Sequence, residues 1–311
     1  MAHDRIIYKV VRAYYEDGLT QQEIGNKYGL SRIKVSRMLS RALEDKIVQI
    51  NINAPTEKYH NLEHKLETKY GIEEVVVVDT GTDEQDEVIA SIGRAAAGYL
   101  NANLQGNEII GLTWGRTLLN MVNALNVDHF PELQVVQMLG GLGEPEAGQH
   151  GADLTRRLAE KLSTKPRLIH APGIVRSRDF CQELIDDLQV SKTLNLAARA
   201  DIALVGLGLF RPGSSTFLSD HILSEKDQIL LESWKVMGDI SLRFFDDQGR
   251  FVTTEIDDRI VGLNIDQLQK IPRIIGVAGG KDKYPVIRAA LKGKLIHVLI
   301  TDQNTAEKLA K

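Results

Sequence analysis

The chain has 311 residues, enough for about two domains, and its 43% hydrophobic and 26% charged residues exclude the collagen-like and wholly disordered classes. It has one cysteine, no apolar run near the ~20 residues that a membrane span needs, and no apolar segment after its charged N-terminus. We therefore expect a soluble cytoplasmic protein without an internal disulfide or a cysteine-based zinc site.

The charge is distributed unevenly along the chain. Residues 1–55 carry nine Lys or Arg against six Asp or Glu, a net charge of +3, whereas the remainder carries 29 against 36, a net charge of −7. Residues 31–41 alone hold four cations and no acidic residue. This asymmetry indicates a small polyanion-binding head, residues 1–55, followed by an acidic body, residues 56–311.

The head begins with two predicted helices. Apolar residues recur at helical spacing from Ile6 to Tyr14, and the pair at 17–18, Asp-Gly, ends that first helix. Thr20 and Glu23 have the spacing of a capping box at the start of the second helix. Gly29 ends it, because glycine adopts the left-handed backbone of a tight turn without a steric penalty.

Ser31 is the predicted N-cap of a third, basic helix. Residues 47–52 then alternate in polarity as a short strand or wing does. Two helices joined by a glycine turn are typical of a helix-turn-helix, whose second helix enters the major groove of DNA. The residues that we expect on the inward face of the third helix are Val35, Met38, Leu39, Ala42 and Leu43.

The outward face of the third helix carries cations and hydroxyls that suit DNA. We expect Arg32, Ser36 and Arg37 to face base edges, since arginine to guanine is the commonest specific contact. A protein-interaction module of the same shape is the alternative interpretation. The predicted DNA-binding residues, including those nearer phosphates, are Thr20, Gln21, Ser31, Arg32, Lys34, Ser36, Arg37 and Arg41.

In the body, a polar connecting helix over residues 58–70 is followed by alternating strands and helices. This alternation predicts an α/β domain with a largely parallel, doubly wound sheet. We expect the connecting helix to be the lever between body and head. The predicted strands are residues 74–78, 108–113, 133–139, 167–170, 201–206, 273–278 and 295–301, and the predicted helices include 84–104, 152–162, 225–234 and 284–291.

Four of these strands run into glycine-rich turns, at residues 111–116, 139–143, 206–208 and 278–281. Ligands of open parallel sheets bind beyond the carboxyl ends of the strands, and turns without side chains expose N–H groups that suit phosphate. The turns predict a small phosphorylated ligand, with tight strand-to-helix connections as the alternative. The chain has neither a dinucleotide fingerprint nor a nucleotide-triphosphate loop, so we expect no cofactor.

Residues 238–249 gather several charged side chains: Asp239, Arg243, Asp246 and Asp247. A carboxylate accepts hydrogen bonds from sugar hydroxyls, so Asp239 is a candidate for binding a polyol. A helix cap followed by a turn at Gly249 is an equally good interpretation.

His60 and His64 flank Glu63 with the His-x-x-Glu-His spacing of an inverted zinc-protease motif. The segment lies in the predicted connecting helix and has no obvious third ligand or substrate cleft. We interpret it as a polar helix face and expect no metal site.

Taken together, the motifs resemble those of the SorC family of sugar-responsive bacterial transcriptional regulators. The resemblance implies an effector domain similar to sugar-phosphate isomerases, and a homo-oligomer, commonly a tetramer, on paired operator half-sites of a carbohydrate operon. The rival is an isomerase-like enzyme with a DNA-binding head, in which Asp239 or Asp246 would be the base. The motifs that carry the resemblance are residues 14–24, 31–39, 110–115, 238–246, 258–262 and 277–280.

The resemblance also assigns effector-binding residues. Some members have a lysine, able to form a Schiff base, where this chain has Leu139, so a non-covalent ketose or polyol phosphate is favoured. The residues assigned by the resemblance are Thr113, Trp114, Gly115, Gly206, Gly208, Asp239 and Lys283, and the glycine turns add Arg116, Gly279 and Gly280.

Overall fold

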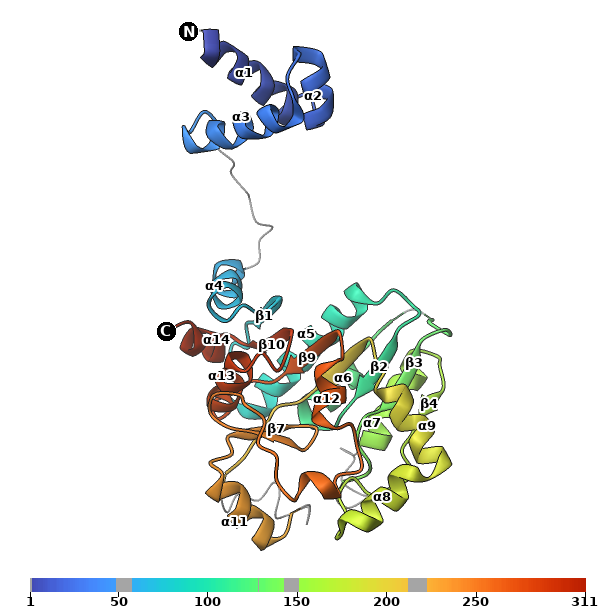
Figure 1. Ribbon diagram of the computed structural model, residues 1–311. Helices are drawn as coiled ribbons and strands as arrows, with labels where there is room; N and C mark the ends of the chain where they lie inside the picture. The colour runs from blue at the N-terminus through green and yellow to red at the C-terminus, as the bar shows by residue number, and fades with distance from the viewer. Residues whose placement is uncertain (1, 49–57, 128, 143–150, 212–222) are drawn as a thin grey trace. The chain divides into compact units, whose positions relative to one another are not determined.

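The structure, a computed structural model, describes residues 2–48, 58–127, 129–142, 151–211 and 223–311 (Figure 1). The chain divides into two compact units, Met1–Glu57 and Lys58–Lys311, and each has its own hydrophobic core. Within the described ranges, no helix is long and apolar enough to cross a membrane.

The head unit packs three helices around a small apolar core: α1 (Ala2–Tyr15), α2 (Gln21–Tyr28) and α3 (Arg32–Glu44). The prediction of three helices is confirmed. The buried residues of this core are Ile7, Val10, Val11, Ala13, Ile24, Val35, Met38, Leu39 and Ala42.

The predicted helix caps are present in the head. Thr20 Oγ1 accepts a hydrogen bond from the N–H of Glu23, whose carboxylate accepts one from the N–H of Thr20, so the capping box is complete. Gly29 follows with a φ of 67°, the left-handed conformation expected of it. Ser31 Oγ then accepts from the N–H of Lys34 at 3.2 Å and fixes the start of α3.

Some details of the predicted head are wrong. Leu43 is 41% exposed, because it lies at the edge of the inward stripe in the last turn of α3. In α1 the inward face is centred on Ile7 rather than Ile6, and Tyr14 is exposed. The predicted wing falls mostly on residues 49–52, which lie outside the described residues.

Seven strands form the main sheet of the body unit. All neighbouring pairs are parallel, which confirms the predicted fold class. The strand order is β1 (Glu74–Val78), β10 (Val298–Asp302), β9 (Arg273–Val277), β5 (Ile202–Val205), β2 (Ile109–Leu112), β3 (Gln134–Gln137) and β4 (Pro166–Arg167). The last of these is shorter than the predicted strand at 167–170, since residues 168–170 form no ladder.

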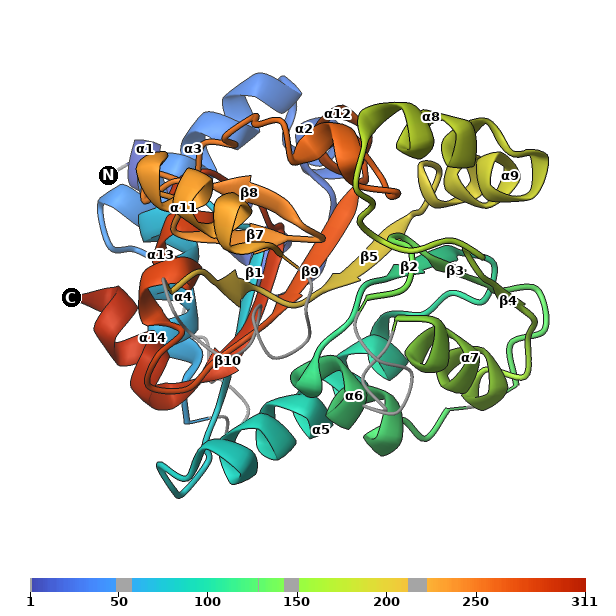
Figure 2. The ribbon, with the colours of Figure 1, turned by 90° about the horizontal axis from the view of Figure 1, so that it is seen from below.

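Helices cover both faces of this sheet. In β5, Ile202 and Leu204 belong to one hydrophobic cluster, whereas Ala203 and Val205 belong to another, as alternating side chains of a buried strand should. Figure 2 shows α5 (Gln85–Asn103), α6 (Arg116–Ala124) and α7 (Gly151–Lys161) along one side. The opposite cluster includes residues of α4 (His60–Tyr70), α9 (Leu188–Ala197), α13 (Tyr284–Lys292) and α14 (Gln303–Ala310).

The predicted connecting helix is α4, and it belongs to the body. Leu66 is fully buried in the body core, and the Tyr70 hydroxyl donates to the carbonyl of Leu309 at 3.1 Å. Tyr59, just before α4, donates to Gln303. Packing and hydrogen bonds hold α4 against β1 and α14, and its role as the lever between body and head stays a prediction.

A small antiparallel sheet accompanies the main one. It contains β6 (Gly208–Leu209), β7 (Gly238–Ile240) and β8 (Arg243–Phe245), strands too short for the sequence pattern to reveal. The remaining described helices are α8 (Arg178–Asp186), α11 (Glu225–Ser233), η2 (Asp257–Arg259) and α12 (Ile265–Gln269).

The strand order fixes where a ligand should bind. From β2 the chain continues to β3 and β4 in one direction, and from β5 to β9 and β10 in the other. Because β2 and β5 are neighbours, their carboxyl ends form the topological switch point of the sheet. Connections leave this point toward opposite sides, which opens a crevice beyond the strands.

Candidate functional site

A cavity of about 450 Å³ lies at this switch point, within the range of roughly 300–1,000 Å³ usual for small-molecule sites. Eight of the ten predicted effector residues line it, and Gly279 and Gly280 do not. Five parts of the body line it. They are Gln85 and Ile89 of α5, residues 113–118 after β2, residues 206–209 and Arg211 after β5, Asp239 and Ser241 of the β7–β8 hairpin, and Val277 at the end of β9 with Ala278, Asp282 and Lys283 after it.

The turn after β5 brings the cavity walls close together. Gly208 is paired with Asp239 between β6 and β7, and a Cβ at Gly208 would overlap the Asp239 carboxylate. A Cβ at Gly206 would lie 3.4 Å from the carbonyl of Trp114, in the turn after β2. The glycine at 208 is therefore needed to seat the carboxylate of Asp239 at the cavity.

Helix α6 begins at the cavity with an uncapped N-terminal end. Its N-cap, Gly115, has no side chain to cap the helix, and its first turn holds no acidic residue. The first N–H of α6 that donates to a helix carbonyl is that of Leu119, and it donates to the carbonyl of Gly115. The preceding N–H groups of residues 116–118, all lining the cavity, have no partner of this kind and favour a bound anion.

A carboxylate and an ammonium occupy the other side of the cavity. Asp239 is only 5% exposed, and its Oδ2 accepts from the N–H of Leu242 at 2.9 Å. Lys283 Nζ donates to the carbonyl of Leu207 at 2.7 Å. Burial raises the pKa of Asp239 to about 6, against the opposing effects of the Leu242 N–H and the charge of Lys283. Burial also lowers the pKa of Lys283, which Asp239 opposes.

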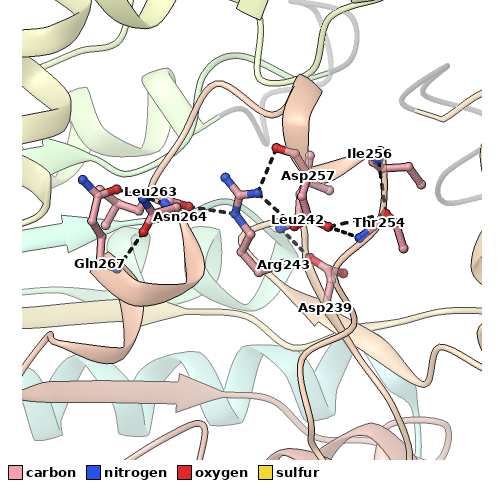
Figure 3. A network of polar contacts seen from close by, with 9 residues as sticks. All are labelled: Asp239, Leu242, Arg243, Thr254, Ile256, Asp257, Leu263, Asn264 and Gln267. Atoms are coloured by element: carbon pink, nitrogen blue, oxygen red, sulfur yellow. Dashed lines mark hydrogen bonds and ion pairs between the residues drawn. The ribbon is translucent and has the colours of Figure 1, made fainter. Parts of the chain in front are cut away.

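The hairpin that carries Asp239 is anchored from behind by Arg243 (Figure 3). This buried guanidinium donates through Nε to the carbonyl of Leu263 at 2.8 Å and through Nη1 to Asp257 Oδ1 at 3.0 Å. The charged cluster seen in the sequence therefore has two roles: Asp239 faces the cavity, and Arg243 holds the hairpin in place.

Ser241 is a cavity residue that sequence reasoning missed. It is 4% exposed, and its hydroxyl has no hydrogen-bond partner among the described residues. Ser241 and Leu242 have φ values of 56° and 61°, so two non-glycine residues make the tight turn between β7 and β8. The signal in the sequence was the spacing: Ser241 follows Asp239 by two residues.

Several predicted effector residues already form hydrogen bonds or ion pairs with other residues of the protein. The Thr113 hydroxyl donates to the carbonyl of Leu204 at 3.3 Å, and Arg116 forms an exposed ion pair with Asp86 at the rim. The N–H of Gly280 donates to Asp302 Oδ2 at 2.6 Å, so this amide serves the turn rather than the cavity.

Two other features of the sequence lie apart from the cavity. Asp246, the second candidate base, is paired with Arg250 at 2.7 Å in the turn after β8 and does not line the cavity. His60 and His64 each lie beside a glutamate of their own helix. Among the residues that the structure describes, no group of three or more His, Cys, Asp or Glu could hold a metal ion.

On the head, the predicted DNA-binding residues remain accessible. The four cations of α3 are exposed, and Gln21 and Ser36 are partly exposed. Arg41 forms an exposed ion pair with Asp45 at 3.2 Å. The hydroxyls of Thr20 and Ser31 are hydrogen-bonded in the helix caps, so these two side chains chiefly fix the geometry of the helix starts.

Comparisons with known proteins agree with both units. The family model "Sugar-bind", a sugar-binding domain, matches residues 54–311, and the model of sigma-70 region 4 matches residues 8–45. The deoxyribonucleoside regulator of Bacillus subtilis is 31% identical over 97% of this chain and 96% of its own length.

The sorbitol operon regulator of Klebsiella pneumoniae is 30% identical over 99% of this chain and 98% of its own. The crystal structure of that full-length regulator, SorC, covers 100% of both chains with a TM-score of 0.76 and 29% identity. The chain therefore belongs to the SorC family of sugar-responsive, DNA-binding transcriptional regulators.

Proposed function

We propose that the cavity binds a phosphorylated sugar or polyol, and that this effector controls operator binding by the head of a cytoplasmic regulator of carbohydrate use. The observation that carries the proposal is that one cavity has two chemically different ends, one suited to a phosphate and one suited to hydroxyl groups. One end is the uncapped N-terminus of α6, and the other is the carboxylate and ammonium of Asp239 and Lys283.

The α6 end supports a phosphate. Backbone N–H groups at a helix N-terminus bind anions through direct hydrogen bonds and through the helix dipole. Arg116 and Arg211 line the same cavity and add positive charge, although each is paired with an aspartate, Asp86 and Asp282 respectively. A dianionic phosphate would compete with these exposed aspartates for the two guanidinium groups.

The Asp239 end supports hydroxyls. Asp239 Oδ2 is occupied by the N–H of Leu242, which leaves Oδ1 as an acceptor with no donor among the described residues. The free hydroxyl of Ser241 can donate or accept. Leu139, at the position of the Schiff-base lysine of some family members, is buried in a hydrophobic cluster. These contacts suit a non-covalent ketose or polyol.

Control of DNA binding requires two conformations of the body that bind the effector with different affinity. We propose that the protein acts as a homo-oligomer, with tetramers on paired operator half-sites. Large exposed apolar side chains on three body helices support subunit contacts there. They are Phe180 on α8, Leu188 on α9 and Ile229 on α11.

The proposal is tested with the full-length protein by titration calorimetry against ketose, aldose and polyol phosphates, each paired with its dephosphorylated form. We expect one ester to bind, its dephosphorylated form to fail, and Asp239→Asn to lose binding. Asp246→Asn, whose carboxylate lies outside the cavity, is the control and should bind normally. The same ester must then change the affinity for DNA from upstream of the protein's own gene, and binding without that change would contradict the proposal.

An isomerase-like enzyme is the second candidate. The observation that favours it is the pKa of about 6 at Asp239, to which burial raises this carboxyl, because a general base works best when its pKa is near the operating pH. We propose that the protein senses its ligand without converting it. Prolonged incubation with the bound ester, followed by chromatography of the sugar phosphates, should show no product, and turnover abolished by Asp239→Asn would establish the enzyme.

A further inference from the structure

We propose that Ile33 of α3 is a specificity-determining residue that packs against the 5-methyl group of a thymine in the operator. The inference rests on the DNA-binding function of the head and deepens it, because it assigns base readout to an apolar side chain among the cations.

Ile33 lies where an apolar residue has no partner within the protein. It is 67% exposed, whereas the buried residues of α3 all lie on the opposite side of the helix. At 3.6 residues per turn, Arg37 and Ser40 follow Ile33 along the same line of the helix surface. Ile33 therefore occupies the middle of the outward face of α3.

The start of α3 holds this side chain rigidly. Ile33 is the second residue of the helix, one turn before Arg37, and the Ser31 cap fixes the backbone around it. A β-branched side chain in a helix has one strongly preferred rotamer, so presenting it loses little conformational entropy. The first turn of a recognition helix is the part that meets base edges.

The surrounding charges favour DNA over a protein partner. Arg32, Lys34 and Arg37 surround Ile33, and none of them forms an ion pair with a described residue. A second copy of this face would be repelled, whereas phosphates would be attracted. In the major groove the apolar group on offer is the thymine methyl, and an isoleucine has no polar atom with which to bind a phosphate.

The test begins with an operator selected from random duplex DNA by the full-length protein. Each thymine of that site is then replaced by deoxyuridine, which pairs identically and lacks the methyl group. Dissociation constants are measured by fluorescence anisotropy for the wild type and for Ile33→Ala. We expect one thymine per half-site whose replacement weakens wild-type binding about fourfold, the value of one buried methyl group.

For Ile33→Ala, we expect weaker binding to the thymine operator and no further loss with deoxyuridine at that position. Ile33→Val keeps the branched apolar surface and should keep the sensitivity to the methyl group. The melting temperature and the oligomeric state of each variant are measured alongside, and both should match the wild type.

Three results would overturn the inference, and a fourth would overturn the function on which it rests. A wild type indifferent to every deoxyuridine, or losses that simply add in the Ile33→Ala variant, would show that Ile33 does not read a methyl group. A changed oligomeric state would place Ile33 at a contact between copies of the chain. Failure to select any site would overturn the DNA-binding function itself, which keeps the two failures distinguishable.

Discussion

The head and the body place their candidate functional groups in opposite environments. On the head, Arg32, Lys34 and Arg37 are exposed on one face of α3. In the body, Asp239 and Ser241 are almost fully buried at the end of a cavity. The exposed charges of the head can attract a large polyanion from a distance. The buried groups of the body can bind only a ligand small enough to enter the cavity, whose hydrogen bonds must replace those that the same groups make to water.

This difference determines what each unit responds to. Exposed charges act through long-range fields and are screened by salt, so binding by the head should depend on ionic strength. Buried groups have shifted pKa values and are closely packed. Ligand binding in the cavity should therefore depend on pH and be sensitive to the addition of a single methyl group to its wall. Substitutions that affect one unit alone are the way to test this separation.

The largest effect is expected from Gly208→Ala. The added methyl group would overlap the carboxylate of Asp239 and displace it from the cavity. Calorimetry should show effector binding lost, and chemical denaturation should show a destabilisation of about 1–3 kcal/mol, as overpacking usually gives.

Gly98→Ala is the matched control for this change. Gly98 lies in α5, and a Cβ there meets nothing within 4 Å. The variant should bind effector normally and gain about 0.5–1 kcal/mol of stability, because alanine restricts the unfolded chain. Effector binding that survives Gly208→Ala would separate the Asp239 carboxylate from recognition.

A pH dependence follows from Asp239. Burial raises its pKa to about 6 in the folded protein, against about 3.8 for the free group. Between these values the folded state holds the proton more tightly than the unfolded state, so stability falls as the pH rises from about 4 to 6. Asp239→Asn should remove this fall, a difference of at most about 3 kcal/mol, measured by denaturant unfolding across that range.

Asp246→Asn should have the opposite sign. Burial alone would raise the pKa of Asp246, but hydrogen bonds from the backbone and guanidinium of Arg250 outweigh it and lower that pKa. Native Asp246 therefore contributes stability that is lost as the pH falls, and its removal should be felt most above pH ~4. If both variants changed the pH profile in the same direction, the environments assigned here would be wrong.

The two units also differ in how far the sequence predicts them. In the head, cap residues and helical spacing are local signals, and the capping box at Thr20 and the turn at Gly29 were predicted in place. The prediction that Leu43 is buried was wrong, because its exposure depends on what packs over the last turn of α3. That is a tertiary fact which no local pattern contains.

In the body, the parallel sheet and the end of it at which a ligand is expected follow from alternating elements. What the sequence could not supply is the strand order, which places the turns after β2 and β5 side by side. Gly140, after β3, does not line the cavity and lies against Ala171 and Pro172. Ser241 was missed because its left-handed turn is made without glycine.

The sharpest test of the head comes from Arg37→Ala. Arg37 lies on the outward face of α3, where we expect a hydrogen-bonded contact to a base edge. Its loss should weaken binding to the selected operator by about 1–3 kcal/mol and relax the base preference at one position. Calorimetry with the effector should be unchanged.

Lys34→Ala removes the same charge from the same helix and is the matched control. Lys34 is expected at a phosphate, so its loss should weaken operator and random DNA equally and reduce the slope of log affinity against log salt by about 1. Anisotropy titrations of both variants on both DNAs, at several salt concentrations, separate the two roles. If Arg37→Ala also weakened both DNAs equally, the outward face of α3 would be a charged surface for phosphates, and base readout would have to come from elsewhere on the head.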